Sequence, residues 1–155
     1  MKPNAKSCAQ RAAANPFGKC LYFTANAVAR HVTRLAEDAL APTGLNPSSG
    51  MLLHLVVNEP GLLPSVAAET LHLAPSSVTR FADQLERKGL VRREVSGRQV
   101  SLHSTPEGER MLESVEAAWS TLLENYSRDV GKRRGSSLAK ELAEVAELLH
   151  EGREV

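Results

Sequence analysis

The chain has 155 residues, of which 42% are hydrophobic and 4% aromatic, and its formal net charge is +1. This length suits one domain, or one domain with an extended assembly region. The longest apolar stretches, such as residues 51–57, are too short to span a bilayer, and no continuous apolar segment follows Lys2 and Lys6 as a signal peptide would require. We therefore expect no membrane partner and a cytoplasmic location.

The N-terminal third predicts an arm and two helices. Residues 1–15 are polar and Ala-rich, which predicts a flexible, at most partly helical arm. Residues 17–41 then predict a long helix, because one face collects apolar residues at helical spacing, namely Leu21, Ala25, Val28, Val32, Leu35 and Ala39. Pro42-Thr43-Gly44 ends it. Asn46 as N-cap and Pro47 in the first turn predict a second helix that runs to about Asn58.

The next segment predicts two helices joined by a tight turn. Residues 64–71 form a short, Ala-rich helix candidate, and Leu71-His72-Leu73 is an apolar turn. A helix is then predicted from about Pro75 to Lys88, with one apolar face made by Val78, Phe81, Ala82 and Leu85. Gly89 fits the position just past the helix end. Two helices with such a short connection form a helix-turn-helix, whose second helix enters the major groove of DNA.

A short basic β-hairpin is predicted to follow. Residues 90–95 and 99–103 alternate in part between apolar and polar, and Ser96-Gly97-Arg98 supplies the turn. From Ala74 to Ser104 there are six basic and three acidic residues, an excess of +3 in a chain whose total is +1. A local positive excess is expected of a surface that contacts phosphates.

The C-terminal part predicts two more amphipathic helices. Thr105 is a plausible N-cap for a long helix that carries Met111, Leu112, Val115, Ala118, Trp119, Leu122 and Tyr126. The basic segment 131–135, bounded by glycines, predicts a break, and residues 136–150 predict the last helix.

The terminal helices carry more apolar surface than a small winged domain can cover. One interpretation is a helical layer within one chain. The interpretation we favour is a two-fold dimer in which the terminal helices of two chains interlock, because DNA readers of this kind bind two symmetric half-sites. We therefore predict a dimerisation region at 16–41 and 105–152, and a DNA-binding winged helix-turn-helix domain at 45–104.

The sequence SSVTRFADQLERKGLVRREVSGRQVSLHSTPEGERML, residues 76–112, resembles the winged helix-turn-helix core of the MarR family of bacterial transcription regulators. The resemblance implies a mainly α fold with a small β-hairpin (α+β) and N- and C-terminal dimerisation helices. It also implies a homodimeric, sequence-specific DNA-binding regulator, a repressor, that acts on a pseudo-palindromic site. Two departures stand out: the tip Ser96-Gly97-Arg98-Gln99 lacks the family's usual Asp, and Leu63 stands where Thr or Ser commonly caps the first helix of the motif.

Candidate DNA contacts follow from the predicted helix and hairpin. Small hydroxyl side chains let a helix approach a groove, while Arg and Gln reach base edges or phosphates. Arg98 at the hairpin tip is expected to reach the minor groove or its flanking phosphates, and Arg92 and Arg93 to support the wing or contact phosphate. The full set of candidate contacts is Ser76, Ser77, Thr79, Arg80, Gln84, Arg87, Lys88, Arg92, Arg93 and Arg98.

The resemblance also suggests an effector, because family members often bind phenolic or other aromatic acids between the dimer helices and the winged domain. The residues that could approach such a crevice are His31, Arg34, Met51, His54, Leu55 and Trp119. The alternative is that Met51, Leu55 and Trp119 are core residues and the two histidines are spectators. An effector would act by changing the distance between the two recognition helices.

Release by an oxidant is a further hypothesis. Cys8 and Cys20 are predicted to be free thiols, and Cys20 is the candidate redox residue. A peroxide-sensing branch of the resembled family carries a reactive Cys nearby, but alignment on Arg30, Thr33 and Arg34 puts that position at Tyr22, so an ordinary cysteine is the simpler interpretation.

Other chemistry finds no support in the sequence. No His or Cys pair has close metal-ligand spacing, and no nucleophile or phosphate-loop motif is present, so we expect no metal, no cofactor and no enzymatic activity. The alternative to a DNA-binding regulator is a winged-helix protein-interaction module without DNA binding.

Overall fold

The computed structural model describes residues 5–151. The chain divides into two compact units, one ending at Arg34 and the other beginning at Leu35. Among the described residues, no helix is long and apolar enough to cross a membrane.

The first unit contains helix α1 (Ala5–Ala14) and most of helix α2 (Leu21–Leu40). The predicted arm is therefore helical over residues 5–14, and its flexibility remains a prediction. Helix α2 begins four residues later than the sequence predicted, because residues 16–19 form a turn in which the Cys20 amide donates to the Phe17 carbonyl at 2.9 Å. The rings of Phe17 and Phe23 stack beside this turn at 5.6 Å.

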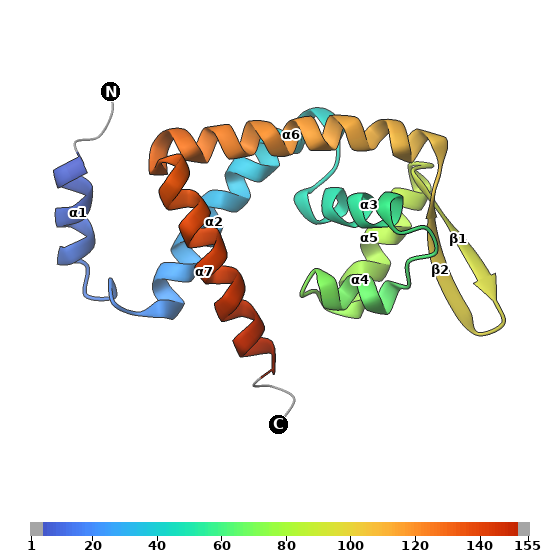
Figure 1. The fold of residues 1–155 in the computed structure, drawn as a ribbon, viewed down its shortest axis with the longest axis horizontal. Coiled ribbons are helices and arrows are strands. Elements are labelled where there is room, and N and C mark those ends of the chain that lie inside the picture. The colour runs from blue at the N-terminus through green and yellow to red at the C-terminus, as the bar shows by residue number, and fades with distance from the viewer. Residues whose placement is uncertain (1–4, 152–155) are drawn as a thin grey trace. The chain divides into compact units, whose positions relative to one another are not determined.

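The second unit holds the remaining elements, which Figure 1 labels. After the end of α2 come the 3-10 helix η1 (Ala41–Thr43), α3 (Pro47–Asn58), α4 (Pro64–Thr70), α5 (Pro75–Arg87), β1 (Val91–Ser96), β2 (Gln99–Ser104), α6 (Pro106–Val130) and α7 (Lys132–Glu151). Helix α3 lies between α6 on one side and α4 and α5 on the other, and the hairpin follows the end of α5 (Figure 1). The fold is mainly α with one antiparallel hairpin, as predicted.

The core of this unit is aliphatic. Leu52, Leu53 and Val56 of α3 are fully buried, and they pack in one cluster with apolar residues of α5, the hairpin and α6, among them Val78, Leu85, Leu102 and Val115. Burying such side chains contributes about 1.5–3 kcal/mol each, so this cluster is the main source of stability for the helix-turn-helix and its wing.

Helix ends in this region follow the local chemistry of the sequence. The side chain of Asn46 accepts a hydrogen bond from the Ser49 amide at 2.8 Å, and that of Thr105 accepts one from the Gly108 amide at 3.0 Å. Both caps were predicted. Leu63 makes no capping hydrogen bond, also as predicted.

One glycine is required by a close approach. A Cβ at Gly108 would lie 2.0 Å from the Leu90 carbonyl oxygen, far inside contact distance. The Thr105 hydroxyl donates to the Gly89 carbonyl at 2.7 Å in the same place. The first turn of α6 is thus packed directly on the backbone that leads into the wing.

The hairpin register pairs Val91 with Ser104 and Ser96 with Gln99, which leaves a two-residue loop, Gly97-Arg98. Gly97 has a φ of +63°, the conformation that a two-residue loop beginning with glycine needs. The sequence did not predict that Leu62 pairs with Leu102, through a Leu102 amide that donates to the Leu62 carbonyl at 2.8 Å. This bridge fixes the base of the wing to the loop before α4.

The predicted break before the last helix is wrong in extent. Helix α7 begins at Lys132, directly after Gly131 with its φ of +90°, and runs through Gly135 without interruption. The physical reason is that a single left-handed glycine is sufficient to end α6, while a glycine inside a helix costs only about 1 kcal/mol relative to Ala.

Candidate nucleic-acid interface

Helices α4 and α5 form a helix-turn-helix whose turn is held by backbone hydrogen bonds. The His72 amide donates to the Glu69 carbonyl at 3.0 Å and the Leu73 amide to the Ala68 carbonyl at 2.9 Å. His72 takes a left-handed conformation, with a φ of +49°. The buried Ala67 and Ala68 let α4 approach α5 closely. The turn therefore sets the direction in which α5 leaves α4.

The outer face of α5 carries the predicted contacts of its first half. Ser76, Thr79 and Arg80 are exposed, and Ser77 is half-buried. The Thr79 hydroxyl donates back to the Pro75 carbonyl at 3.1 Å, and the Arg80 guanidinium lies over the Phe81 ring at 5.1 Å. Helix α5 thus presents small polar groups in its first turn, with one arginine beyond them.

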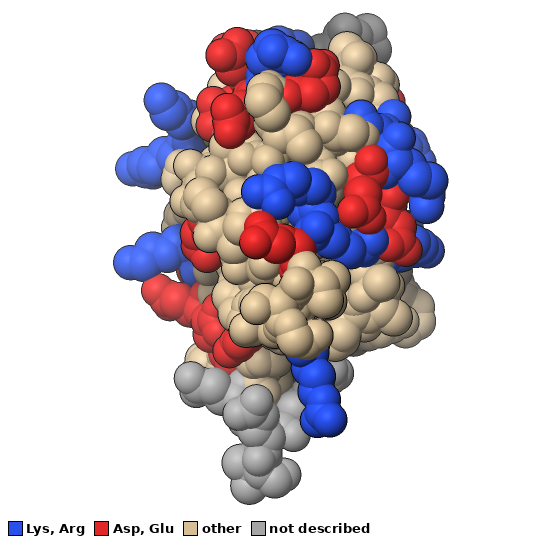
Figure 2. All heavy atoms as spheres, turned by 90° about the vertical axis from the view of Figure 1, so that its right-hand side faces the viewer, with Lys and Arg blue, Asp and Glu red and all other residues tan. Residues whose placement is uncertain are grey.

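Four cations of this region are exposed and available. Arg80, Arg87, Lys88 and Arg98 form no ion pair with any residue that the structure describes. Arg87 and Lys88 lie at the end of α5, and Arg98 occupies the hairpin tip. Figure 2 shows basic and acidic side chains interspersed on the face that carries the hairpin, not one continuous basic patch. Binding of phosphate by this face depends on a few individual cations.

Arg93 does not belong to that exposed group. Its guanidinium lies 2.5 Å from the Asp83 carboxylate and 2.6 Å from that of Glu86, and it donates to the Thr79 carbonyl at 3.3 Å. Its side chain is 25% exposed. Of the two roles that the sequence predicted for Arg93, these contacts fit support of the wing, because they tie β1 to α5.

Gln84 is bound to side chains at the start of α3. Its side-chain oxygen accepts hydrogen bonds from the Ser49 hydroxyl at 3.2 Å and from the Asn46 side-chain amide at 3.3 Å. Ser49 is fully buried and Gln84 is half-buried. The Gln84 oxygen thus joins the middle of α5 to the first turn of α3.

Arg92 lies in a small cluster on the wing. Its guanidinium pairs with Glu94 at 3.1 Å, and His103 on the opposite strand lies 3.4 Å from the same carboxylate. The Ser101 hydroxyl is 3.1 Å from His103 Nε2. Arg92 is exposed, so it is positioned beside Glu94 yet accessible to a phosphate.

The six predicted effector residues are divided between the two units. His31 and Arg34 lie in the first unit and are exposed. In the second unit, Leu55 and Trp119 pack against the core, and His54 is exposed, 3.8 Å from Glu116. Met51 is 44% exposed. For Leu55 and Trp119 the structure fits the core-packing alternative.

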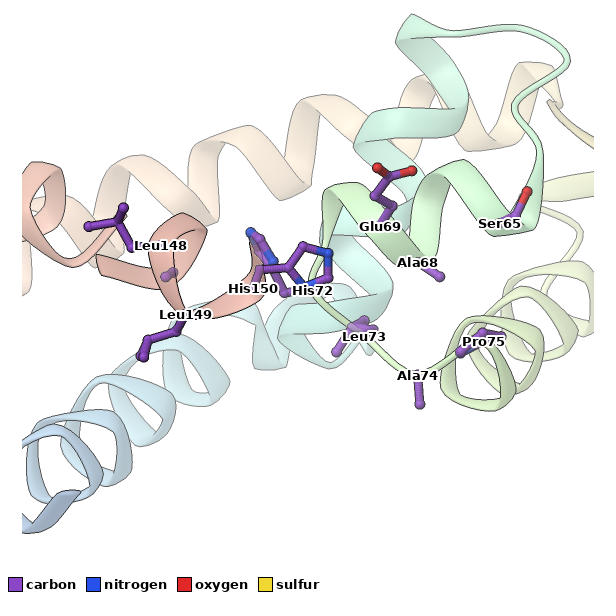
Figure 3. Close-up of a pocket in the computed structure, with 11 residues that line it drawn as sticks. Ser65, Ala68, Glu69, His72, Leu73, Ala74, Pro75, Leu148, Leu149 and His150 are labelled. Carbon is purple, nitrogen blue, oxygen red and sulfur yellow. The ribbon is translucent and has the colours of Figure 1, made fainter. Parts of the chain in front are cut away.

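A cavity of the second unit lies between the α4–α5 turn and the end of α7. It has a volume of about 1040 Å³, and none of the four candidates of this unit lines it. Figure 3 shows His72 and His150 next to each other at this junction, with their ring centroids 5.5 Å apart. His72 Nε2 is also 3.4 Å from the Glu147 carboxylate.

Cys20 is a free, exposed thiol before α2; Cys8 lies in α1, outside the described side chains. Within residues 5–151 no group of three His, Cys, Asp or Glu side chains could hold a metal ion.

The residues that hold the interface together were missed by sequence reasoning. These are Asn46, Ser49, Asp83 and Glu86, which bind Gln84 or Arg93. One signal was available: Asp83 and Glu86 are three residues apart and so share a helix face next to a basic strand. No local pattern marks Ser49 as a partner of Gln84, because 35 residues separate them.

The helix-turn-helix, the hairpin beside it and the exposed cations on both define a winged helix-turn-helix protein. Residues 43–99 match the model of the MarR family. The solved structure of a MarR-family transcriptional regulator from Rhodococcus sp. RHA1 superposes with a TM-score of 0.77 at 25% identity, over 86% of this chain and 96% of that one. The helix-turn-helix and wing of this chain are thus those of the MarR family of transcription regulators. This match agrees with the prediction that the chain is not an enzyme.

Two further proteins are similar. CouR from Rhodococcus jostii RHA1, solved bound to p-coumaroyl-CoA, is 25% identical with a TM-score of 0.75, over 86% of this chain and 96% of that one. A putative transcriptional regulatory protein for the hcr operon of Thauera aromatica is 36% identical over 88 residues, which is 55% of this chain. The match spans 53% of that protein's length.

Proposed function

We propose that the protein is a sequence-specific DNA-binding repressor that acts as a homodimer on a pseudo-palindromic duplex. The observation that carries the proposal is the set of four exposed cations without ion-pair partners in the described chain, Arg80, Arg87, Lys88 and Arg98, on a recognition helix and its wing. Cations in this state can exchange their counterions for phosphate without breaking an internal pair. A bacterial DNA target implies action in the cytoplasm.

The proposed contacts divide by position. Ser76, Ser77, Thr79 and Arg80 lie in the first half of α5, which would enter the major groove. Arg87 and Lys88 would meet the DNA backbone, and Arg98 the minor groove or its flanking phosphates. Arg92 is proposed as a phosphate contact and Arg93 as the support of the wing.

The homodimer is proposed because α7 leaves an apolar stripe uncovered. Leu138, Leu142, Val145 and Leu149 recur at spacings of three and four and are 37–63% exposed. An amphipathic helix must bury such a stripe against something, and a second copy of the chain offers an identical one. Two copies would present two recognition helices to two half-sites.

The proposal extends to a small aromatic effector. This part of it rests on the likeness to CouR, which binds p-coumaroyl-CoA, and on the six candidate residues of the sequence, from His31 to Trp119. Release of DNA by p-coumaroyl-CoA or by simple phenolic acids would support it. Release by peroxide that is lost in Cys20→Ser would support the redox alternative.

The test of DNA binding is a salt titration on random duplex. For a dimer with four cations on each protomer, we expect the logarithm of the affinity to fall linearly with the logarithm of the salt concentration, with a slope on the order of −4 to −7. Negligible binding at every salt concentration would contradict the proposal and favour the protein-interaction module.

A further inference from the structure

We infer that Gln84 is a positioning residue, which fixes the recognition helix α5 to the first turn of α3 through its side-chain oxygen and does not read an adenine. The inference rests on the proposed DNA binding and changes one of its predicted contacts. It concerns three side chains, Asn46, Ser49 and Gln84, which we call the α3–α5 lock.

The orientation of the lock follows from one backbone amide. The Ser49 amide donates to Asn46 Oδ1 at 2.8 Å, as the N-cap of α3. That bond turns the Asn46 nitrogen toward α5, where it donates to Gln84 at 3.3 Å. A nitrogen donor can meet only an oxygen, so the amide of Gln84 must present its Oε1 to α3.

Ser49 reinforces the same orientation. Its hydroxyl is fully buried and donates to Gln84 Oε1 at 3.2 Å. Two hydrogen bonds occupy both lone pairs of this oxygen. Reading of adenine by glutamine needs the oxygen as acceptor for adenine N6 and the nitrogen as donor to N7. Because both lone pairs of its oxygen are already used, Gln84 has only its amide nitrogen left to bind a base. It therefore cannot form both hydrogen bonds with adenine.

The position of Gln84 on α5 suits a lock. Its side-chain oxygen meets Asn46 and Ser49 at the start of α3. Its neighbour Asp83 meets Arg93 of the wing at 2.5 Å. Consecutive residues therefore fix α5 on two sides, against the wing and against α3.

The first turn of α3 is itself firmly placed. A Cβ at Gly50 would lie 3.2 Å from Leu40 and 3.4 Å from Val115, which shows how tightly α3 packs against the end of α2 and against α6. The lock therefore ties α5 to the junction of three helices. Loss of the lock should let the angle between α5 and α3 vary, while the hydrophobic core stays packed.

Ser49→Ala tests the inference because a fully buried side chain cannot touch DNA. Operator duplex and random duplex are titrated with the wild type, Ser49→Ala, Gln84→Met and the double variant. Ser48→Ala is the matched control, a half-buried serine of the same turn whose hydroxyl forms no hydrogen bond in the described chain. Affinities are normalised to folded protein, and thermal unfolding is measured for each variant.

We expect Ser49→Ala to weaken operator binding about threefold to tenfold, with random-duplex affinity changed by less than about twofold, because specific binding depends on the helix angle and non-specific binding on charge. The double variant should bind about as well as Gln84→Met alone, since both changes break one network. Ser48→Ala should match the wild type.

Equal operator affinity for Ser49→Ala and Ser48→Ala would overturn the inference. So would a double variant in which the affinity losses of the two single variants multiply. A third contrary result is that Gln84→Met, and not Ser49→Ala, loses the preference for one base pair of the operator. If the wild type binds no DNA, the proposed function fails. The unfolding data then test the lock independently of DNA. Non-additive losses of stability for Ser49→Ala and Gln84→Met would support the lock, and additive losses would overturn it.

Discussion

The winged helix-turn-helix and helix α7 differ in how far their apolar side chains are buried within the chain. In the former, Leu52, Leu53 and Val56 of α3 are completely buried by elements of the same chain. In α7, every described side chain is exposed, including Leu142 at 46%. Both helices carry an apolar stripe, but that of α3 is buried within one chain and that of α7 is exposed. The proposal of a homodimer has the stripe of α7 buried against a second copy of the chain.

The largest expected effect is on the free energy of unfolding, when a glycine of each region is replaced by alanine. Gly108→Ala should lower the free energy of unfolding by about 3 kcal/mol or more, because the added methyl group meets the Leu90 carbonyl oxygen in the tightly packed region. Chemical denaturation measures the change. Gly135→Ala in α7 is the control, where the nearest atom is a side-chain carbon of Tyr126 at 3.1 Å. Equal stability of the two variants would contradict the tighter packing around Gly108 than around Gly135.

A second substitution tests what covers α7. Leu138→Asp combined with Leu142→Asp should raise the dimer dissociation constant about a hundredfold or more, because charges would enter a buried interface. Sedimentation measures the association state. The control is Lys140→Gln, a change at an exposed position on the same helix. Undisturbed dimers in the Asp variant would mean that the stripe is not the interface.

Within the winged domain, Arg93→Ala should lower the free energy of unfolding by about 1–2 kcal/mol and also weaken operator binding, because Asp83 and Glu86 lose their shared partner. Both readouts come from one protein preparation. Arg92→Ala, which removes a guanidinium paired on the surface with Glu94, should leave stability within about 0.5 kcal/mol. Identical stability losses would contradict the supporting role of Arg93.

The smallest effect on stability concerns the hairpin tip. Arg98→Ala should leave stability unchanged and weaken DNA binding by about 1–3 kcal/mol if the side chain reads a groove. If it meets phosphate only, the salt slope should decrease by about 1 for each protomer. Binding with the same affinity and the same slope as the wild type would remove Arg98 from the interface.

The sequence was sufficient where local chemistry decides the structure. Asn46, Thr105 and Gly89 were predicted as helix ends, because capping depends on residues within one turn. The start of α7 was misjudged, since Gly135 resembles a breaker in sequence but lies inside the helix. The pairing of Leu62 with Leu102 involves too few residues to produce an alternating pattern.

The interface was predicted in outline, and its internal supports were not. Exposed cations such as Arg80 and Arg98 follow from the periodicity of the helix and from the turn. Gln84 was predicted as a base or phosphate contact, and Arg93 as a support of the wing or a phosphate contact. The contacts that orient them, to Ser49 and to Asp83, were not predicted. Such contacts between distant residues depend on how the elements pack, which periodicity does not determine.

The most direct test of the central claim is selection of bound duplexes from a random pool by the full chain, with the operator then titrated with p-coumaroyl-CoA. The account predicts enrichment of a pseudo-palindrome whose half-sites lie about 10–11 base pairs apart, centre to centre, one for each recognition helix of a dimer. Recovery of no enriched sequence at low salt would contradict it.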